Sequence, residues 1–163
     1  MESYRKIADE KMNSNTKNEK IYEKYAWIIF FAIGAITLLS AVFHALGINS
    51  DPAFVKSIAG HSINELNNLN PMFFNLYDFY FRSGGLSDMG FAFFLIVISV
   101  TAYRQGDKWA WYAFWFVPAF FLGYVALSLT IGESGSSLLP PLIMFILLSI
   151  LGLLLPFRKF FPR

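Results

Sequence analysis

The chain has 163 residues, of which 56% are hydrophobic, 19% aromatic and 15% charged, and its formal net charge is +2. Typical soluble domains have about 25% charged residues, and a soluble domain of this length cannot bury so much apolar surface. The small net charge gives no indication of nucleic-acid binding, and the absence of cysteine excludes disulfides, thiolate metal sites and cysteine redox chemistry.

Four stretches of the chain are apolar and long enough to cross a bilayer, so the sequence predicts an all-α integral membrane protein built as a four-helix bundle. A bilayer core of about 30 Å needs roughly 20 helical residues. The clearest stretch, residues 109–131, has 23 residues without a charge and would reach about 35 Å as a helix.

The chain begins with a polar arm, residues 1–24, which is rich in Lys, Glu and Asn. Its low hydrophobicity favours a solvated and partly disordered segment, either a tail that sets the topology or a recognition segment. The first span is predicted at about residues 25–47. Three small residues in it, Gly34, Ala41 and Ala45, would allow a second helix to approach closely.

Residues 48–85 separate the first span from the second and carry helix signals. Asp51, followed by a proline, predicts a helix start, and Ser62 with Glu65 fits a capping box. An aromatic segment at 72–82 follows, and the Ser-Gly-Gly sequence after it predicts a break before the second span. We expect an outer cap of short helices lying in the membrane interface.

The remaining spans are predicted at about residues 86–103, 109–131 and 138–157. The turn between the second and third spans has only five residues, so these two helices should be antiparallel neighbours. Gly106 supplies the tight bend in this turn. In the third span Pro118 removes a backbone hydrogen bond and therefore predicts a kink.

The basic residues gather on one side of the predicted bundle. Eleven of the thirteen Lys and Arg residues lie in the arm 1–24, the turn 104–108 and the basic tail 158–163. By the positive-inside rule, the N- and C-termini are then cytoplasmic and residues 48–85 lie outside. The predicted location is the plasma (cytoplasmic) membrane, as a multi-pass protein.

Five polar residues are candidates for ligand binding. His44 and Asp88 are ionisable and fall inside predicted spans near their outer ends. Tyr124 of the third span has a comparable depth, and Asp78 and Arg82, spaced i and i+4, can close over the same layer. The functional interpretation is an outward-facing small-molecule pocket or a proton-titrating site in which Asp88 sets the charge of His44. The structural alternative is that these side chains reach the headgroups, or that His44 and Asp88 form a hydrogen bond between spans.

Other chemistries lack their sequence signatures. The two histidines and scattered carboxylates have no metal-ligand spacing, haem would need axial histidines deep in the bundle, and no phosphate-binding loop or nucleophile elbow is present. No polar path crosses the midplane as an ion channel would require. We therefore assign no catalytic residue, metal or cofactor.

Two functions remain open from these residues. The first is a non-catalytic accessory subunit or binding component of a membrane complex, whose partners are the lipid bilayer and another membrane protein or a second copy of the chain. The second is a membrane enzyme or transporter with an outward-facing pocket around His44 and Asp88. The sequence favours the first.

The run Tyr-Arg-Gln-Gly-Asp-Lys-Trp-Ala-Trp-Tyr at residues 103–112 resembles a feature of small, uncharacterised prokaryotic four-span membrane proteins. In those proteins an Arg-x-Gly turn leads into a Trp-Ala-Trp start of the third helix. The number of spans and the loop lengths also resemble the DoxX-like group. This resemblance implies a four-helix membrane bundle. DoxX-like proteins have been linked to respiratory and redox complexes, but no residue here matches a catalytic residue of theirs, so no site is carried over.

Overall fold

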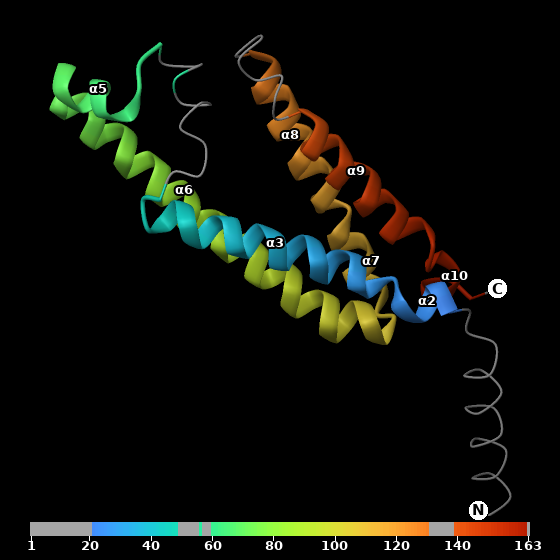
Figure 1. The fold of residues 1–163 in the computed structure, drawn as a ribbon. Helices are drawn as coiled ribbons and strands as arrows, with labels where there is room; N and C mark the ends of the chain where they lie inside the picture. Colours follow the sequence, from blue (N-terminus) through green and yellow to red (C-terminus); the bar gives the residue numbers. More distant parts are fainter. Residues whose placement is uncertain (1–20, 49–55, 57–59, 131–138, 163) are drawn as a thin grey trace, which may run out of the picture.

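The computed structural model describes residues 21–48, 56, 60–130 and 139–162, which form helices joined by turns and contain no strand (Figure 1). Three helical segments are long and apolar enough to cross a membrane: Ile21–Ala45, Pro71–Tyr103 and Lys108–Thr130. The all-α class of the described residues and the presence of helices long and apolar enough to cross a membrane are thus confirmed. A fourth apolar helix, α9 (Leu139–Leu154), has 16 residues and reaches about 24 Å. The predicted helix start at Asp51 and the connection between the predicted third and fourth spans, residues 132–137, lie outside the described residues.

The first long segment consists of α2 (Ile21–Tyr25) and α3 (Trp27–Ala45). α3 ends in a Schellman motif, in which the N–H of Gly47 donates to the His44 carbonyl and the N–H of Ile48 donates to the Phe43 carbonyl, both at 2.9 Å. Gly47 has φ +74°, which a residue with a Cβ atom adopts only at a cost. The end of the first span is therefore at the glycine where the sequence placed it.

The second long segment differs from its prediction. α6 (Pro71–Ile98) continues directly into a π-helical segment, η1 (Ser99–Tyr103), and together they form 33 helical residues. The predicted break in the Ser-Gly-Gly sequence is therefore wrong, and residues 72–82 are the first part of α6 and not a separate helix. At about 1.5 Å per residue this rod is about 50 Å long. Before it lies α5 (Ile63–Leu69), which begins with the predicted capping box.

Close packing explains why α6 continues through its glycines. Glycine costs about 1 kcal/mol relative to alanine inside a helix, but Gly85 lies against the backbone of α3. A Cβ atom at Gly85 would be 2.5 Å from the Ala45 nitrogen and 2.9 Å from the Ala41 oxygen. Further along α3, a Cβ atom at Gly34 would be 3.2 Å from the Ala92 oxygen of α6. The small residues of the first span thus lie at this helix contact, as predicted.

The third long segment contains α7 (Lys108–Phe114) and α8 (Phe116–Thr130). The turn before it bends at Gly106, which has φ +87°. The helix is interrupted at Trp115, three residues before Pro118. Because Pro118 has no N–H, it cannot donate to the carbonyl of Phe114, and the ring crowds the preceding turn. The helix is thus interrupted one turn before the proline at which the sequence predicts a kink.

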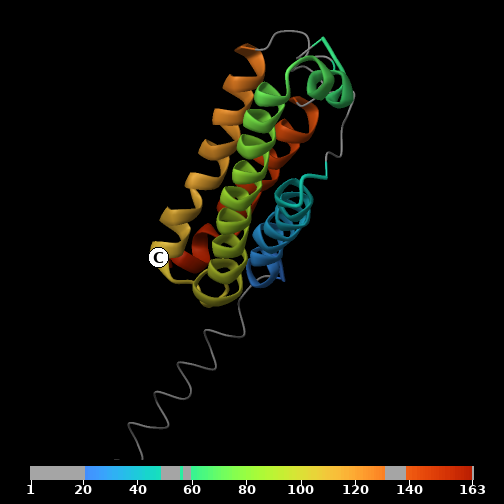
Figure 2. The ribbon, with the colours of Figure 1, turned by 90° about the vertical axis from the view of Figure 1, so that its left-hand side faces the viewer.

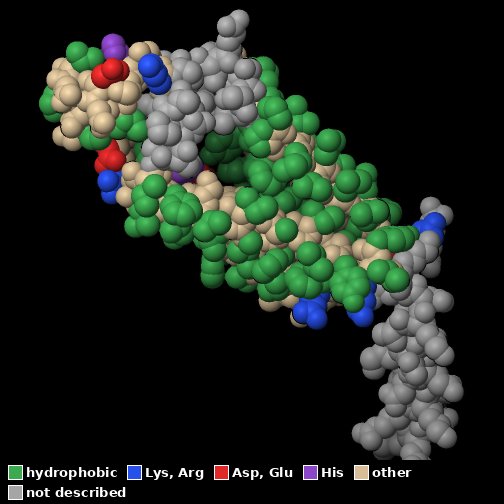
Figure 3. All heavy atoms as spheres, in the orientation of Figure 1, with side chains coloured by type: hydrophobic (Ala, Val, Ile, Leu, Met, Phe, Trp, Pro, Cys, Tyr) green, Lys and Arg blue, Asp and Glu red, His purple; other side chains and the backbone are tan. Residues whose placement is uncertain are grey.

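The helices form two pairs that converge at one end. α3 packs along α6, and α8 packs along α9. The pairs meet where α2, η1, α7 and α10 (Phe157–Phe160) come together, an end that we call the base. Away from the base the pairs diverge, and α5 lies at the far end of α6 (Figures 1 and 2). Figure 3 shows hydrophobic side chains over the middle of the molecule, with the charged side chains gathered towards its two ends.

Candidate functional site

The base is closed by two hydrogen bonds from aromatic side chains. The hydroxyl of Tyr103 donates to the Gly152 carbonyl at 2.6 Å, and Nε1 of Trp111 donates to the Leu153 carbonyl at 2.9 Å. In a continuous helix the Gly152 carbonyl would accept from residue 156, which is Pro156 and has no N–H. Tyr103 therefore supplies the donor that α9 lacks at its own C-terminal end.

Tyr103 also lies at the centre of the hydrophobic core. It is 2% exposed, and its ring contacts those of Phe30, Phe114 and Phe160, with centroids 5.1, 4.8 and 4.7 Å away. It is the last residue of η1, and the wider π-helical turn changes the direction of the side chains that follow it. All the long helical segments thus meet around one tyrosine.

The predicted polar residues lie further from the base. His44 packs against Gly85, where a Cβ atom would be 2.8 Å from the His44 Cβ. Its ring lies on that of Phe81, with centroids 4.8 Å apart. Asp88 is three residues beyond Gly85 on the same face of α6, while Phe81 is four residues before it. Within the described chain no hydrogen bond joins His44 to Asp88, and the ring contact of His44 is with Phe81.

Asp88 instead contacts the third segment. The Tyr124 hydroxyl of α8 donates to Oδ1 of Asp88 at 3.4 Å, which is a long hydrogen bond. One turn nearer the base, the ring of Phe91 stacks on that of Phe120 at 4.3 Å. These side chains connect α6 to α8. Seventeen residues of α6 precede Asp88, so the helix itself begins well before the start predicted for the second span.

Asp78 and Arg82 form the predicted i, i+4 pair, with Nε of Arg82 donating to Oδ2 of Asp78 at 2.8 Å. The Arg82 guanidinium also lies directly against Gly47, where a Cβ atom would overlap it. Its positive charge is thus placed at the C-terminal, negative end of the α3 dipole. Arg82 is six residues, or about 9 Å along the helix, further from the base than Asp88, and Asp78 is ten residues, or about 15 Å, further. The structure therefore groups His44, Asp88 and Tyr124 and places Asp78 and Arg82 one level away.

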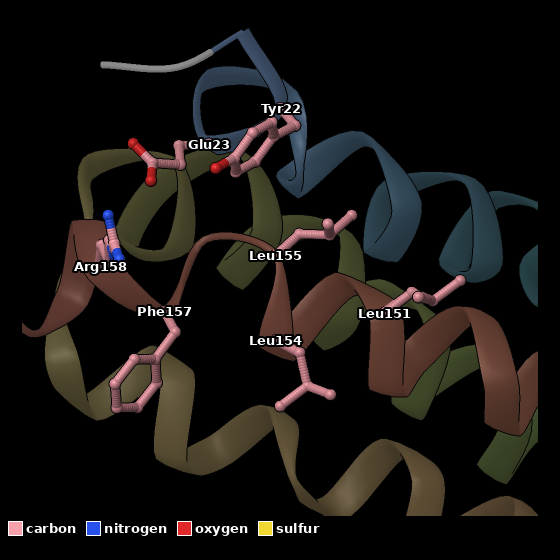
Figure 4. Close-up of a pocket in the computed structure, with 7 residues that line it drawn as sticks. All are labelled: Tyr22, Glu23, Leu151, Leu154, Leu155, Phe157 and Arg158. Carbon is pink, nitrogen blue, oxygen red and sulfur yellow. The ribbon is translucent and has the colours of Figure 1, made fainter. Parts of the chain in front are cut away.

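A groove at the base was not predicted from the sequence. It has a volume of about 440 Å³ and is lined by Tyr22, Glu23, Leu151, Leu154, Leu155, Phe157 and Arg158 (Figure 4). Its polar rim comes from α2 and α10, and its apolar wall comes from the end of α9. The signal in the sequence was an acidic residue, Glu23, between basic neighbours directly before the first span.

The described residues contain no group of three His, Asp or Glu side chains arranged to hold a metal ion. Comparisons of the chain with known protein families, with curated proteins and with solved structures give no match.

Proposed function

We propose that this protein is a non-catalytic component of a membrane complex, a four-span protein with both termini in the cytoplasm of its cell. In this orientation the base faces the cytoplasm, α9 is the fourth span, and α5 with the first turns of α6 projects outside. The asymmetric distribution of Lys and Arg supports the orientation. The resemblance to small prokaryotic DoxX-like proteins agrees with the span count and suggests the plasma membrane.

The length of α6 with η1 is the observation that supports a binding role. Counted from Tyr103, a helix along the membrane normal covers a core of about 30 Å by the level of Arg82. Tilting does not bring the whole rod within the core of about 30 Å. A rod of about 50 Å still spans about 38 Å at a tilt of 40°, the upper end of the usual range. The first turns of α6 therefore extend beyond the hydrocarbon.

Those first turns are apolar. Large side chains there are strongly exposed: Met72 84%, Phe73 52%, Leu76 53%, Phe79 65% and Tyr80 67%. An apolar surface of this kind outside the bilayer core is typical of a protein interaction site. We therefore place the contact with a partner chain, either another membrane protein or a second copy, on this part of α6.

Site-specific photo-crosslinking in native membranes tests the proposal. A photoreactive residue in place of Phe79 should crosslink to one defined protein chain, which should also co-purify in stoichiometric amount. The control position is Leu147 on α9, which is similarly exposed at 57% and should crosslink to lipid. Lipid adducts at both positions, with a monomeric protein after purification, would contradict the proposal.

A second candidate function rests on the meeting of His44, Asp88 and Tyr124, which come from three different helices. This arrangement suits a membrane enzyme or transporter with a small-molecule pocket that opens away from the base. A ligand of this site should raise the unfolding temperature of the wild type and lose that effect in Asp88→Asn and His44→Ala. If His44→Leu and Asp88→Leu preserve both stability and partner binding, the polar side chains have no such role.

A further inference from the structure

The groove at the base joins a charged rim to an apolar wall. Leu151, Leu154 and Leu155 form the wall and are 49%, 55% and 41% exposed, so they face away from the bundle. The first charged residue after the start of α9 is Arg158. The rim therefore lies where an apolar helix that crosses a bilayer reaches the lipid headgroups.

The rim carries charges of both signs. Glu23 is buried, with 8% of its surface exposed, whereas Arg158 is exposed. Figure 4 shows the two charged groups and the Tyr22 hydroxyl on the same side of the groove, above the leucines of α9. A guanidinium binds phosphate through charge-assisted hydrogen bonds, and a carboxylate accepts them from an ammonium group. The rim is thus complementary to a headgroup that carries both a phosphate and an ammonium.

We propose that this groove binds one phospholipid with a phosphoethanolamine headgroup. Arg158 binds the phosphate, Glu23 and the Tyr22 hydroxyl accept hydrogen bonds from the primary ammonium, and an acyl chain lies along the leucines of α9. The volume of about 440 Å³ is within the range of about 300 to 1,000 Å³ for small-molecule sites. This inference is independent of the proposed partner contact, which lies at the other end of α6.

The chemistry of the rim also disfavours two other common headgroups. The quaternary ammonium of phosphatidylcholine has no N–H to donate to Glu23. Phosphatidylglycerol carries a net negative charge without a compensating ammonium, and the Glu23 carboxylate repels it. Selectivity among the three lipids therefore tests the carboxylate, while retention of any phospholipid tests Arg158.

Native mass spectrometry of the full chain measures this selectivity. The protein is delipidated and offered phosphatidylethanolamine, phosphatidylcholine and phosphatidylglycerol with identical acyl chains in equal amounts. We expect one equivalent of phosphatidylethanolamine to be retained with a preference of about tenfold, the effect of one charge-assisted hydrogen bond. Equal retention of all three lipids, as for a general lipid annulus, or preference for phosphatidylglycerol would overturn the proposal.

Variants assign the roles of the two charged residues. Glu23→Gln should lose the preference for phosphatidylethanolamine over phosphatidylcholine, and Arg158→Gln should reduce the retention of both. The matched control is Lys108→Gln, which removes a positive charge from the base at a residue that does not line the groove. Unfolding temperatures measured in parallel identify any variant that fails to fold, and wild-type selectivity remains decisive in that case. A Glu23→Gln variant that keeps the full preference would refute the assignment of the ammonium contact.

Discussion

Replacement of Tyr103 by phenylalanine should destabilise the base although it removes a single oxygen atom. The ring contacts with Phe30, Phe114 and Phe160 remain, so the loss is confined to the hydrogen bond of 2.6 Å to the Gly152 carbonyl. A buried acceptor left without a donor costs about 1–3 kcal/mol. Because Pro156 offers no N–H in its place, we expect a loss at the upper half of this range, about 2 kcal/mol.

The free energy of unfolding in mixed detergent micelles, followed by tryptophan fluorescence, measures this loss. The matched control is Tyr112→Phe, because the Tyr112 side chain is 59% exposed, and its free energy of unfolding should be unchanged within about 0.5 kcal/mol. The decisive experiment repeats Tyr103→Phe in a Pro156→Ala background. There the alanine N–H can donate to Gly152, so the tyrosine hydroxyl should contribute less, with a coupling of about 1 kcal/mol. An equal loss in both backgrounds would refute the reasoning.

Three further predictions follow from the glycines and the capping box. Gly85→Ala should destabilise the protein by about 1–3 kcal/mol in the same unfolding assay, because the alanine Cβ would be 2.5 Å from the α3 backbone. The control is Gly84→Ala, which should be neutral or stabilising because a Cβ atom there meets nothing within 4 Å. Gly47→Ala should lower the free energy of unfolding more than Gly60→Ala does, because both glycines have positive φ but only Gly47 lies against the Arg82 guanidinium. Equal losses of stability would indicate backbone strain alone. The backbone hydrogen bond from Ser62 lowers the pKa of Glu65 below its ordinary value. The Glu65 carboxylate therefore stabilises α5 at pH values above its pKa in the unfolded chain, and this stabilisation is lost as the pH falls through the lowered pKa of the folded state. Amide hydrogen exchange in α5 should accelerate at low pH in the wild type relative to Glu65→Gln, and identical pH profiles of the two proteins would contradict this.

Local signals predicted the first and third helical segments well. Long runs without charge identify membrane spans because each span must satisfy its own backbone and match the bilayer. The capping box at Ser62 and Glu65 and the bend at Gly106 depend only on neighbours in the chain. The i, i+4 pair of Asp78 and Arg82 was predictable for the same reason.

Features that depend on distant contacts were not predictable in this way. The Ser-Gly-Gly sequence has a low helix propensity, but contact of Gly85 with α3 outweighs it. The hydrogen bond of Tyr103 joins residues 49 positions apart, and no local pattern marks it. The groove combines Glu23 and Arg158 from opposite ends of the described chain. The sequence predicted that polar residues lie together around Asp88, but it did not predict how far along α6 this residue lies, because the helix begins earlier than expected.

In the proposed membrane orientation, the continuity of α6 and η1 couples membrane thickness to the position of α5. One end of the rod is fixed by packing around Tyr103, and the other carries α5 about 50 Å away. A change of 10° in the tilt of α6 would displace α5 by about 9 Å, and helices change their tilt when the hydrocarbon thickness changes. In bilayers of different thickness the same folded protein would therefore present its exposed end at different heights and lateral positions, without any rearrangement of the base.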